Sequence, residues 1–346
     1  MDIYDIYDNI HHLTIMDVDS VRKFMRSSHF ECLHSKCGSW IIFGWMVNPN
    51  NLFDMNNSLT KINLDDLVTA FGWQGHAFPR EFLRLAFRRP AAKFADQMQA
   101  FDGQVGLVGL PEGARKSSSG FVKNIQVFGE ENLLHSGPVL YLSNHPGMTD
   151  TLCLFAALRR PDLRIIAFRR PFLQALPNIS QHLIYVSDDP VDRMGAVRKA
   201  SSHLLAGGAL LTFPAGQIEP DPDVYPGAGE SLGGWLDSAG VFIRFAPETR
   251  IVPVLVRNVL WDKAVRHPLT HLRSSREERE RLGASFQLLL QIIFNFTPVT
   301  VRVQVAPPIG LDEVGSTDTA AIHAVVLERM RSLLQNPPLE QGVALL

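Results

Sequence analysis

Tyr141-Leu-Ser-Asn-His-Pro-Gly-Met-Thr-Asp150 joins the end of a short apolar run to the start of a helical pattern. The run Val139–Ser143 predicts a buried strand, and Pro146-Gly147 predicts a turn. Asp150 stands where the next helix opens. A strand that passes through a tight turn into a helix is the start of a βα unit, from which α/β sheets are built.

The same alternation continues toward the C-terminus. Further apolar runs predict strands at 163–168, 183–187, 209–213, 251–256 and 299–305. Helical patterns fall at 151–159, 193–206 and 232–245, and a last amphipathic helix is expected over 319–334. Strands that alternate with helices predict βαβ units. We therefore expect an α/β fold with a largely parallel sheet flanked by helices, and an N-terminal helical accessory segment.

The texture of the sequence suggests four regions. Residues 1–62 mix His, Asn and Asp with aromatic residues, and no fold is assigned to them. Residues 63–110 are expected to form a helical accessory region, and the Gly- and Ser-containing stretch 111–120 is expected to be a loop. The main α/β domain is expected at 120–310, followed by a C-terminal helix and tail at 311–346.

Arginine recurs at spacing four within the accessory region. Arg80, Arg84 and Arg88 alternate there with apolar residues. One interpretation is a basic amphipathic helix at a lipid interface. The other is a solvated face on a helix that packs against the main domain.

Composition limits the class of protein. The chain has 346 residues, of which 46% are hydrophobic and 20% charged, which excludes global disorder. A formal net charge of −2 gives no basic field, so no nucleic-acid partner is expected. The longest apolar runs, 40–47 and 286–296, are about half of the roughly 20 residues that a membrane-spanning helix needs. Three cysteines are too few for a disulfide framework, which favours a cytoplasmic location.

A metal site is not expected. His29, Cys32, His34 and Cys37 lie close in sequence. Zinc motifs usually pair two well-separated ligand couples, so unrelated small-core residues are the favoured explanation.

His145 and Asp150 carry the candidate chemistry. In open α/β sheets, ligands bind beyond the carboxyl ends of the strands, where His145 is expected. If Pro146-Gly147 folds the chain back, Asp150 can accept a hydrogen bond from Nδ1 and leave Nε2 free as a base. Gly229-Glu230-Ser231-Leu232-Gly233 has the Gly-x-Ser-x-Gly spacing but does not directly follow a predicted strand, so it predicts no nucleophile elbow, and the base would activate a substrate hydroxyl. The alternative is a structural histidine with Asp150 acting only as a helix cap.

Three motifs in order resemble a known family. Asn144-His145-x-x-x-x-Asp150, Phe213-Pro214-Ala215-Gly216 and Ile251-Val252-Pro253-Val254 resemble the glycerol-3-phosphate and 1-acylglycerol-3-phosphate acyltransferase superfamily, over about residues 120–310. The resemblance implies transfer of a fatty acyl group from acyl-CoA or acyl carrier protein to a hydroxyl of a lipid or glycerol-type acceptor. It implies no covalent enzyme intermediate, and no cofactor beyond the thioester co-substrate.

The chain departs from the family where the acceptor phosphate is usually held. The corresponding family motif usually reads Phe-Pro-Glu-Gly-Thr-Arg-Ser. In this chain, Ala215 stands at the position of the family's glutamate and Ile218 at the position of its arginine. Asp188 and Asp189 follow a strand that in the family usually ends in an arginine. Because isoleucine cannot hold a phosphate, a non-phosphorylated hydroxyl acceptor becomes more plausible.

The resemblance assigns candidate site residues. His145 and Asp150 are the catalytic pair, with no metal ligand. The substrate-binding candidates are Asn144, Arg169, Arg170, Phe213, Pro214, Gly216, Gln217 and Glu219. Arg169 and Arg170 stand where the family often has basic residues, or are simply exposed at a strand end. Glu219 is expected to substitute for the missing acid, with Gln217 as its neutral partner.

Two other functions stay open. A catalytically silent relative would bind lipid or acyl-CoA without turnover, although the retained His145 and Asp150 count against it. A thioesterase or esterase would use His145 to activate water. For an acyltransferase we expect a cytoplasmic protein, peripheral on the inner face of the membrane.

Overall fold

The computed structural model describes residues 58–70, 77–272, 276–338 and 342–346. The chain divides into two compact units, one containing 96–262 and 287–346, the other 3–95 and 263–286. His29, Cys32, His34 and Cys37 lie outside the described residues. The sheet and all the candidate site residues belong to the first unit.

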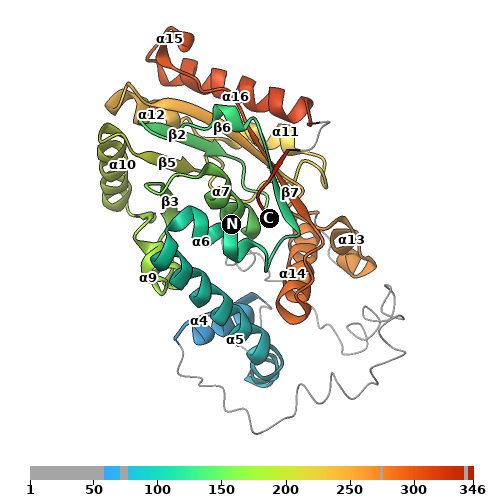
Figure 1. Cartoon of the computed structure of the whole chain (residues 1–346). Coiled ribbons are helices and arrows are strands. Elements are labelled where there is room, and N and C mark those ends of the chain that lie inside the picture. The colour runs from blue at the N-terminus through green and yellow to red at the C-terminus, as the bar shows by residue number, and fades with distance from the viewer. Residues whose placement is uncertain (1–57, 71–76, 273–275, 339–341) are drawn as a thin grey trace. The chain divides into compact units, whose positions relative to one another are not determined.

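An eight-stranded sheet forms the centre of the first unit (Figure 1). Its strands, in spatial order, are β4 (Leu183–Val186), β3 (Arg164–Phe168), β5 (Ala209–Thr212), β2 (Val139–Ser143), β6 (Arg250–Arg257), β7 (Thr300–Val305), β1 (Asn124–Phe128) and β8 (Val343–Ala344). The five strands from β4 to β6 are parallel to their neighbours. β7 is antiparallel to β6, and β8 is antiparallel to β1. The expected α/β class with a largely parallel sheet is therefore confirmed, with antiparallel pairing at one side.

The strand order reverses beside β2. β3, the next strand along the chain after β2, does not lie beside β2. The later strand β5 lies between them. Every residue of β2 is buried, because helices cover both faces of the sheet there. Such a reversal of strand order leaves a crevice beyond the carboxyl ends, and His145 follows the end of β2.

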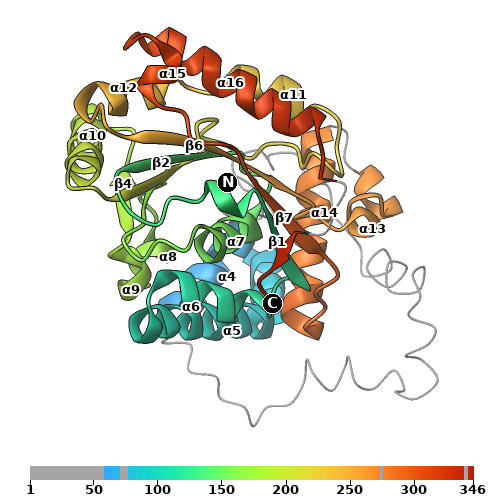
Figure 2. The ribbon, with the colours of Figure 1, turned by 45° about the horizontal axis from the view of Figure 1, so that its top comes forward.

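Helices cover both faces of this sheet (Figure 2). One face packs against α10 (Pro190–Leu205), α12 (Ser238–Phe245) and α16 (Thr319–Gln335), through a core that includes Leu142, Leu210 and Trp235. The other face carries α7 (Met148–Leu158), which packs against α6 (Leu110–Ser118). The shorter helices of this unit are α8 (Pro171–Gln174), α9 (Pro177–Ser180), α11 (Ala228–Ser231) and α15 (Leu311–Val314), and α13 (Asp262–Val265) lies almost entirely in the second unit.

Sequence reasoning missed two strands. β1 alternates half-buried and buried residues, so it lacks the continuous apolar run that marked the inner strands. β8 has two residues, both exposed. The predicted helix over 232–245 was too long, because a 3-10 turn at Leu232–Gly234 precedes α12.

The loop expected at 111–120 was wrong, because α6 occupies most of it. Pro111 stands in the first turn, where its missing N–H costs nothing. Glu112 accepts two hydrogen bonds from Arg115, at 2.7 and 2.8 Å. A Cβ on Gly113 would lie 2.8 Å from the backbone nitrogen of Val105 in α5 (Ala77–Val108). Gly113 therefore permits close helix packing, and its glycine is not a loop signal.

The second unit is helical where it is described. It contains α4 (Ser58–Ala70), the first part of α5, and the first part of α14 (Arg276–Phe294). Arg84 forms an ion pair with Asp65, and the side chain of Arg80 lies outside the described residues. The interpretation of Arg80, Arg84 and Arg88 as part of a lipid-binding helix stays a prediction. Among the helices described, none is long and apolar enough to cross a membrane.

Candidate active site

His145 and Asp150 form a hydrogen-bonded pair just beyond the end of β2. Nδ1 of His145 lies 2.8 Å from Oδ2 of Asp150. The imidazole is 13% exposed, whereas the carboxylate is fully buried. Because an ionised carboxylate accepts hydrogen bonds but cannot donate them, we assign the proton to Nδ1, and Nε2 keeps its lone pair. The pair thus has the arrangement of a base with its orienting acid.

Asp150 also anchors the start of α7. The same oxygen, Oδ2, accepts the backbone N–H of Gly147 at 2.9 Å, and Oδ1 accepts the hydroxyl of Thr151 at 2.9 Å. The two sequence interpretations of Asp150, orienting acid and helix cap, are therefore compatible in one side chain. Three donors hold the carboxylate in place under the imidazole ring.

Asn144 ties the end of β2 to β6. Its Nδ2 donates to the carbonyl of Val256 at 2.9 Å, and its Oδ1 accepts the N–H of Val256 at 2.7 Å. The side chain is 3% exposed. Both functions of the amide are used inside the protein, so Asn144 fixes the position of the adjacent His145 and does not face a substrate.

Glu219 lies under the His145 loop. Its Oε2 accepts the backbone N–H of His145 at 3.1 Å, and Oε1 accepts from Ser231 Oγ at 3.0 Å and Trp235 Nε1 at 2.7 Å. The residue is 3% exposed, and burial raises the pKa of its carboxyl, although the three donors oppose that rise. This environment differs from the expected one, because a buried carboxylate with both oxygens engaged is poorly placed to substitute for an acceptor-binding acid.

The Phe213-Pro214-Ala215-Gly216 segment follows β5 next to His145. The ring of Phe213 stacks on the imidazole with centroids 4.5 Å apart. Gly216 has a left-handed backbone, with φ of 63°, and its N–H bonds to the carbonyl of Phe213 at 3.0 Å. The carbonyl of Pro214 accepts the N–H of Leu236. The segment is thus a tight turn that brings Phe213 to His145 and leaves Gln217 exposed.

Arg169 and Arg170 lie beyond the end of β3, at the same edge of the sheet. Arg169 pairs with Asp192 at 3.6 Å and lies over the ring of Tyr185 at 5.8 Å. Arg170 lies over the ring of Phe168 at 4.8 Å. The Arg169 side chain is 48% exposed, so it stays accessible to a ligand.

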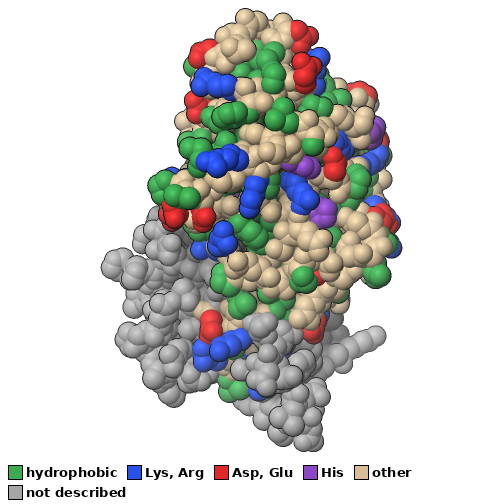
Figure 3. All heavy atoms as spheres, turned by 90° about the vertical axis from the view of Figure 1, so that its left-hand side faces the viewer, with side chains coloured by type: hydrophobic (Ala, Val, Ile, Leu, Met, Phe, Trp, Pro, Cys, Tyr) green, Lys and Arg blue, Asp and Glu red, His purple; other side chains and the backbone are tan. Residues whose placement is uncertain are grey.

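The face that carries α10 is shown in Figure 3, where Lys and Arg side chains are spread among hydrophobic ones. α10 begins just after the carboxyl end of β4, on the same side of the sheet as His145. Its residues Val191 and Met194 are 77% and 56% exposed, and Phe168 is 37% exposed. The exposed Asp188 pairs with Arg193, so charges of both signs accompany these apolar side chains.

Two residues that shape the surroundings of the site were missed by sequence reasoning. Asp221, fully buried, accepts the backbone N–H groups of Asn258, Val259 and Leu260 and so shapes the turn after β6. Burial raises the pKa of its carboxyl. The sequence offered no signal for this role, because acidic residues are common in solvated loops.

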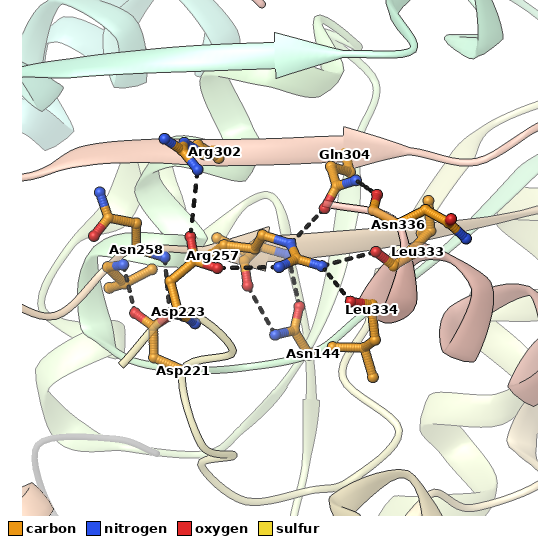
Figure 4. Close-up of polar contacts among 12 residues, drawn as sticks. Asn144, Asp221, Asp223, Arg257, Asn258, Arg302, Gln304, Leu333, Leu334 and Asn336 are labelled. Atoms are coloured by element: carbon orange, nitrogen blue, oxygen red, sulfur yellow. Dashed lines mark hydrogen bonds and ion pairs between the residues drawn. The ribbon is translucent and has the colours of Figure 1, made fainter. Parts of the chain in front are cut away.

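Arg257 is the second missed residue (Figure 4). Its guanidinium donates to Asp223 at 3.0 Å, to Gln304 at 2.5 Å, and to the carbonyls of Leu333 and Leu334 at 2.7 and 3.0 Å. It therefore joins the end of β6, next to the Asn144 contact, to the C-terminal end of α16.

No metal ligands accompany this site in the part of the chain that is described, because no group of three His, Cys, Asp or Glu residues there could hold an ion. Exposed Arg169 is a candidate for binding a phosphate-bearing co-substrate.

Comparison with known proteins gives a family. Residues 124–257 match the Acyltransferase family, a range that begins with the first residue of β1 and ends with the last residue of β6. Curated proteins give no match. The solved structure of the 1-acyl-sn-glycerophosphate (LPA) acyltransferase PlsC from Thermotoga maritima is similar, with a TM-score of 0.41 and 16% identity, covering 82% of this chain and 97% of that chain. Residues 124–257, which include His145 and Asp150, therefore match the acyltransferase family.

Proposed function

We propose that the chain transfers a fatty acyl group from an acyl thioester to a hydroxyl of a glycerolipid or related acceptor, with His145 as general base. The observation that carries the proposal is the 2.8 Å contact between His145 Nδ1 and the fully buried Asp150. This contact leaves Nε2 of His145 free, beyond the carboxyl end of β2, where the strand order reverses.

In this mechanism Nε2 removes the proton of the acceptor hydroxyl while that oxygen attacks the thioester carbonyl carbon. The buried carboxylate of Asp150 stabilises the imidazolium that forms. When the tetrahedral intermediate collapses, the C–S bond breaks, and the leaving thiolate takes the proton back from His145. The products are an ester and a free thiol, without a covalent enzyme intermediate and without a cofactor.

The donor would be acyl-CoA or acyl carrier protein. Arg169, half-exposed at the same edge, is suited to the phosphate groups that both carriers bear. Arg170 is its neighbour, and Gln217 and Gly216 are exposed on the turn that carries Phe213. We propose that these residues border the substrates.

The proposed acceptor is a hydroxyl without an adjacent phosphate. Ala215 is half-buried against the core, and Ile218 stands where the family has its arginine, so neither can hold an anion. A dianionic phosphate would therefore lack the guanidinium that the family offers at this position.

Glycerolipid acceptors reside in membranes, and we propose that the enzyme works at a membrane surface. Val191, Met194 and Phe168 support this, since they expose apolar side chains at the sheet edge that holds His145.

The test is incorporation of a labelled acyl group from palmitoyl-coenzyme A, and from the corresponding carrier-protein thioester, into a total bacterial lipid extract with added glycerol-3-phosphate. Wild type and His145→Ala are compared, and products are identified by mass. A labelled lipid formed by wild type alone supports the proposal and names the acceptor. Free fatty acid with coenzyme release would instead indicate a hydrolase, and binding without turnover from either thioester would indicate a silent lipid-binding relative.

A further inference from the structure

Glu219 forms hydrogen bonds with both the N–H and the carbonyl group of the His145 main chain. The N–H of His145 donates to Oε2 of Glu219 at 3.1 Å, and the N–H of Glu219 donates to the carbonyl of His145 at 3.0 Å. This reciprocal pair joins the loop after β2 to the segment after β5. No other contact in the described residues fixes both main-chain groups of the candidate base.

The second carboxylate oxygen is fixed from the core. Oε1 accepts Trp235 Nε1 at 2.7 Å and Ser231 Oγ at 3.0 Å, and Trp235 is 4% exposed among the residues that pack under β2 and β5. The N–H groups of His145 and Trp235 can only donate, so the ionised carboxylate, which only accepts, matches them. Contacts in the protein interior therefore fix the position of Glu219, and Glu219 in turn fixes the main chain of His145.

We infer that Glu219 is a positioning residue: it holds the His145 main chain where the imidazole keeps its bond to Asp150 and its Nε2 faces the acceptor. The inference rests on the proposed role of His145 as the base. Asp150 fixes the ring from the side-chain end, and Glu219 fixes the chain to which the ring is attached. Loss of either constraint lets Nε2 drift, and a displacement of about 1 Å at a reacting group can lower a rate about 100-fold.

The first variant is Glu219→Gln, which keeps size and removes one acceptor. Whichever way the amide turns, an NH₂ group meets either the His145 N–H or the Trp235 N–H, both of which donate. We expect kcat to fall about 10- to 100-fold with the KM for the thioester unchanged. Asp102→Asn is the matched control. Asp102 is also buried and accepts from Ile179 and Asn178, each at 2.8 Å, on elements that do not carry His145. It should keep wild-type kcat.

A spectroscopic readout separates this inference from the proposed function. In protein labelled with ¹⁵N-histidine, the Nδ1–H proton of His145, bonded to Asp150, should give a downfield resonance that is lost in His145→Ala. Glu219→Gln should shift or broaden that resonance, and Asp102→Asn should leave it unchanged. This measurement needs no substrate, so it tests positioning even where wild type shows no transfer.

Two further variants complete the test. Trp235→Phe removes one donor from Oε1 but keeps the bond to His145, so it should give an intermediate loss of kcat and serves if Glu219→Gln does not fold. In a His145→Ala background, adding Glu219→Gln should not lower the residual rate further. An unchanged resonance with unchanged kcat would overturn the inference. So would a raised acceptor KM with an unchanged resonance, because that result would place Glu219 at the acceptor.

Discussion

One oxygen of Asp150 serves two purposes at the residue scale. Oδ2 accepts both the imidazole of His145 and the N–H of Gly147. The turn between strand and helix and the orientation of the candidate base therefore depend on the same atom. A substitution at this position tests catalysis and local folding together, and the two effects must be measured separately.

Asp150→Asn should lower acyl transfer less than His145→Ala does. The amide can still accept from one donor but no longer stabilises the imidazolium, whereas His145→Ala removes the base and should cost about 10²- to 10⁴-fold. Initial rates of thiol release in the presence of acceptor measure both variants, and a urea titration of each shows whether the fold is intact. Full activity in Asp150→Asn would restrict the residue to capping the helix.

A second prediction concerns the buried carboxyl of Glu219. Burial raises its folded pKa above the ordinary value of 4.5. In the pH range between these two values the native state binds more protons than the unfolded state, so the free energy of unfolding falls as pH rises. Glu219→Gln lacks this titration. The stability of wild type relative to the variant should therefore decrease from about pH 4 upward.

Urea titrations of both proteins at several values between about pH 4 and pH 7 measure this slope. A difference that is independent of pH, or that grows with pH, would contradict the raised pKa.

Sequence spacing predicted the contact between His145 and Asp150 but not the contacts that support it. His145 and Asp150 are five residues apart, within reach across one turn, so their contact was predictable. The partners of Asn144 and Glu219, in contrast, are Val256 and Trp235, on elements that only the folded sheet brings near. For the same reason Glu219 was expected to bind the acceptor, and its burial became visible only in the structure.

At the scale of elements, the predicted strands include those buried on both faces and also the partly exposed β3, β4 and β7. β2, β5 and β6 are continuous apolar runs, which a sequence displays directly. β1, half-buried and alternating, was missed, and α6 was taken for a loop because of its glycine and serines. The packing partner of Gly113 explains that glycine, and it lies on another helix.

Gly113→Ala should therefore destabilise the protein. The new Cβ would lie 2.8 Å from the Val105 backbone nitrogen. Because the helix backbone of α5 would have to shift to relieve this clash, we expect the free energy of unfolding to fall by about 1–3 kcal/mol. Gly103→Ala is the matched control on α5, because its Cβ would meet nothing within 4 Å. It should be neutral or stabilising by up to about 1 kcal/mol. Urea midpoints compare the two, and equal effects would argue against close packing of α6 on α5.

At the scale of the first unit as a whole, Arg257 joins elements far apart in sequence. Its guanidinium is buried and bonds to Asp223, to Gln304 on β7, and to the end of α16. Arg257→Met should lower the free energy of unfolding by about 3–5 kcal/mol, because Asp223 and the helix carbonyls lose a buried charged partner.

Arg302→Met is the control within the same network. Arg302 lies 3.7 Å from the other oxygen of Asp223 and is 41% exposed, so its loss should cost about 0–1 kcal/mol. Thermal and urea unfolding of both variants give the comparison. Equal losses would show that the network does not depend on the buried guanidinium.

The position of β1 in the sheet has a consequence for how the protein is made. β1 is the first strand along the described residues, yet its neighbours are β7 and β8, at Thr300–Val305 and Val343–Ala344. On the ribosome, β1 leaves the exit tunnel long before either partner has been synthesised. The parallel strands β2 to β6 can pair while translation continues, but β1 must wait, with Ile125 and Val127 unburied, until the final segments emerge. The nascent chain therefore carries an unpaired apolar strand while residues 129–299 are synthesised.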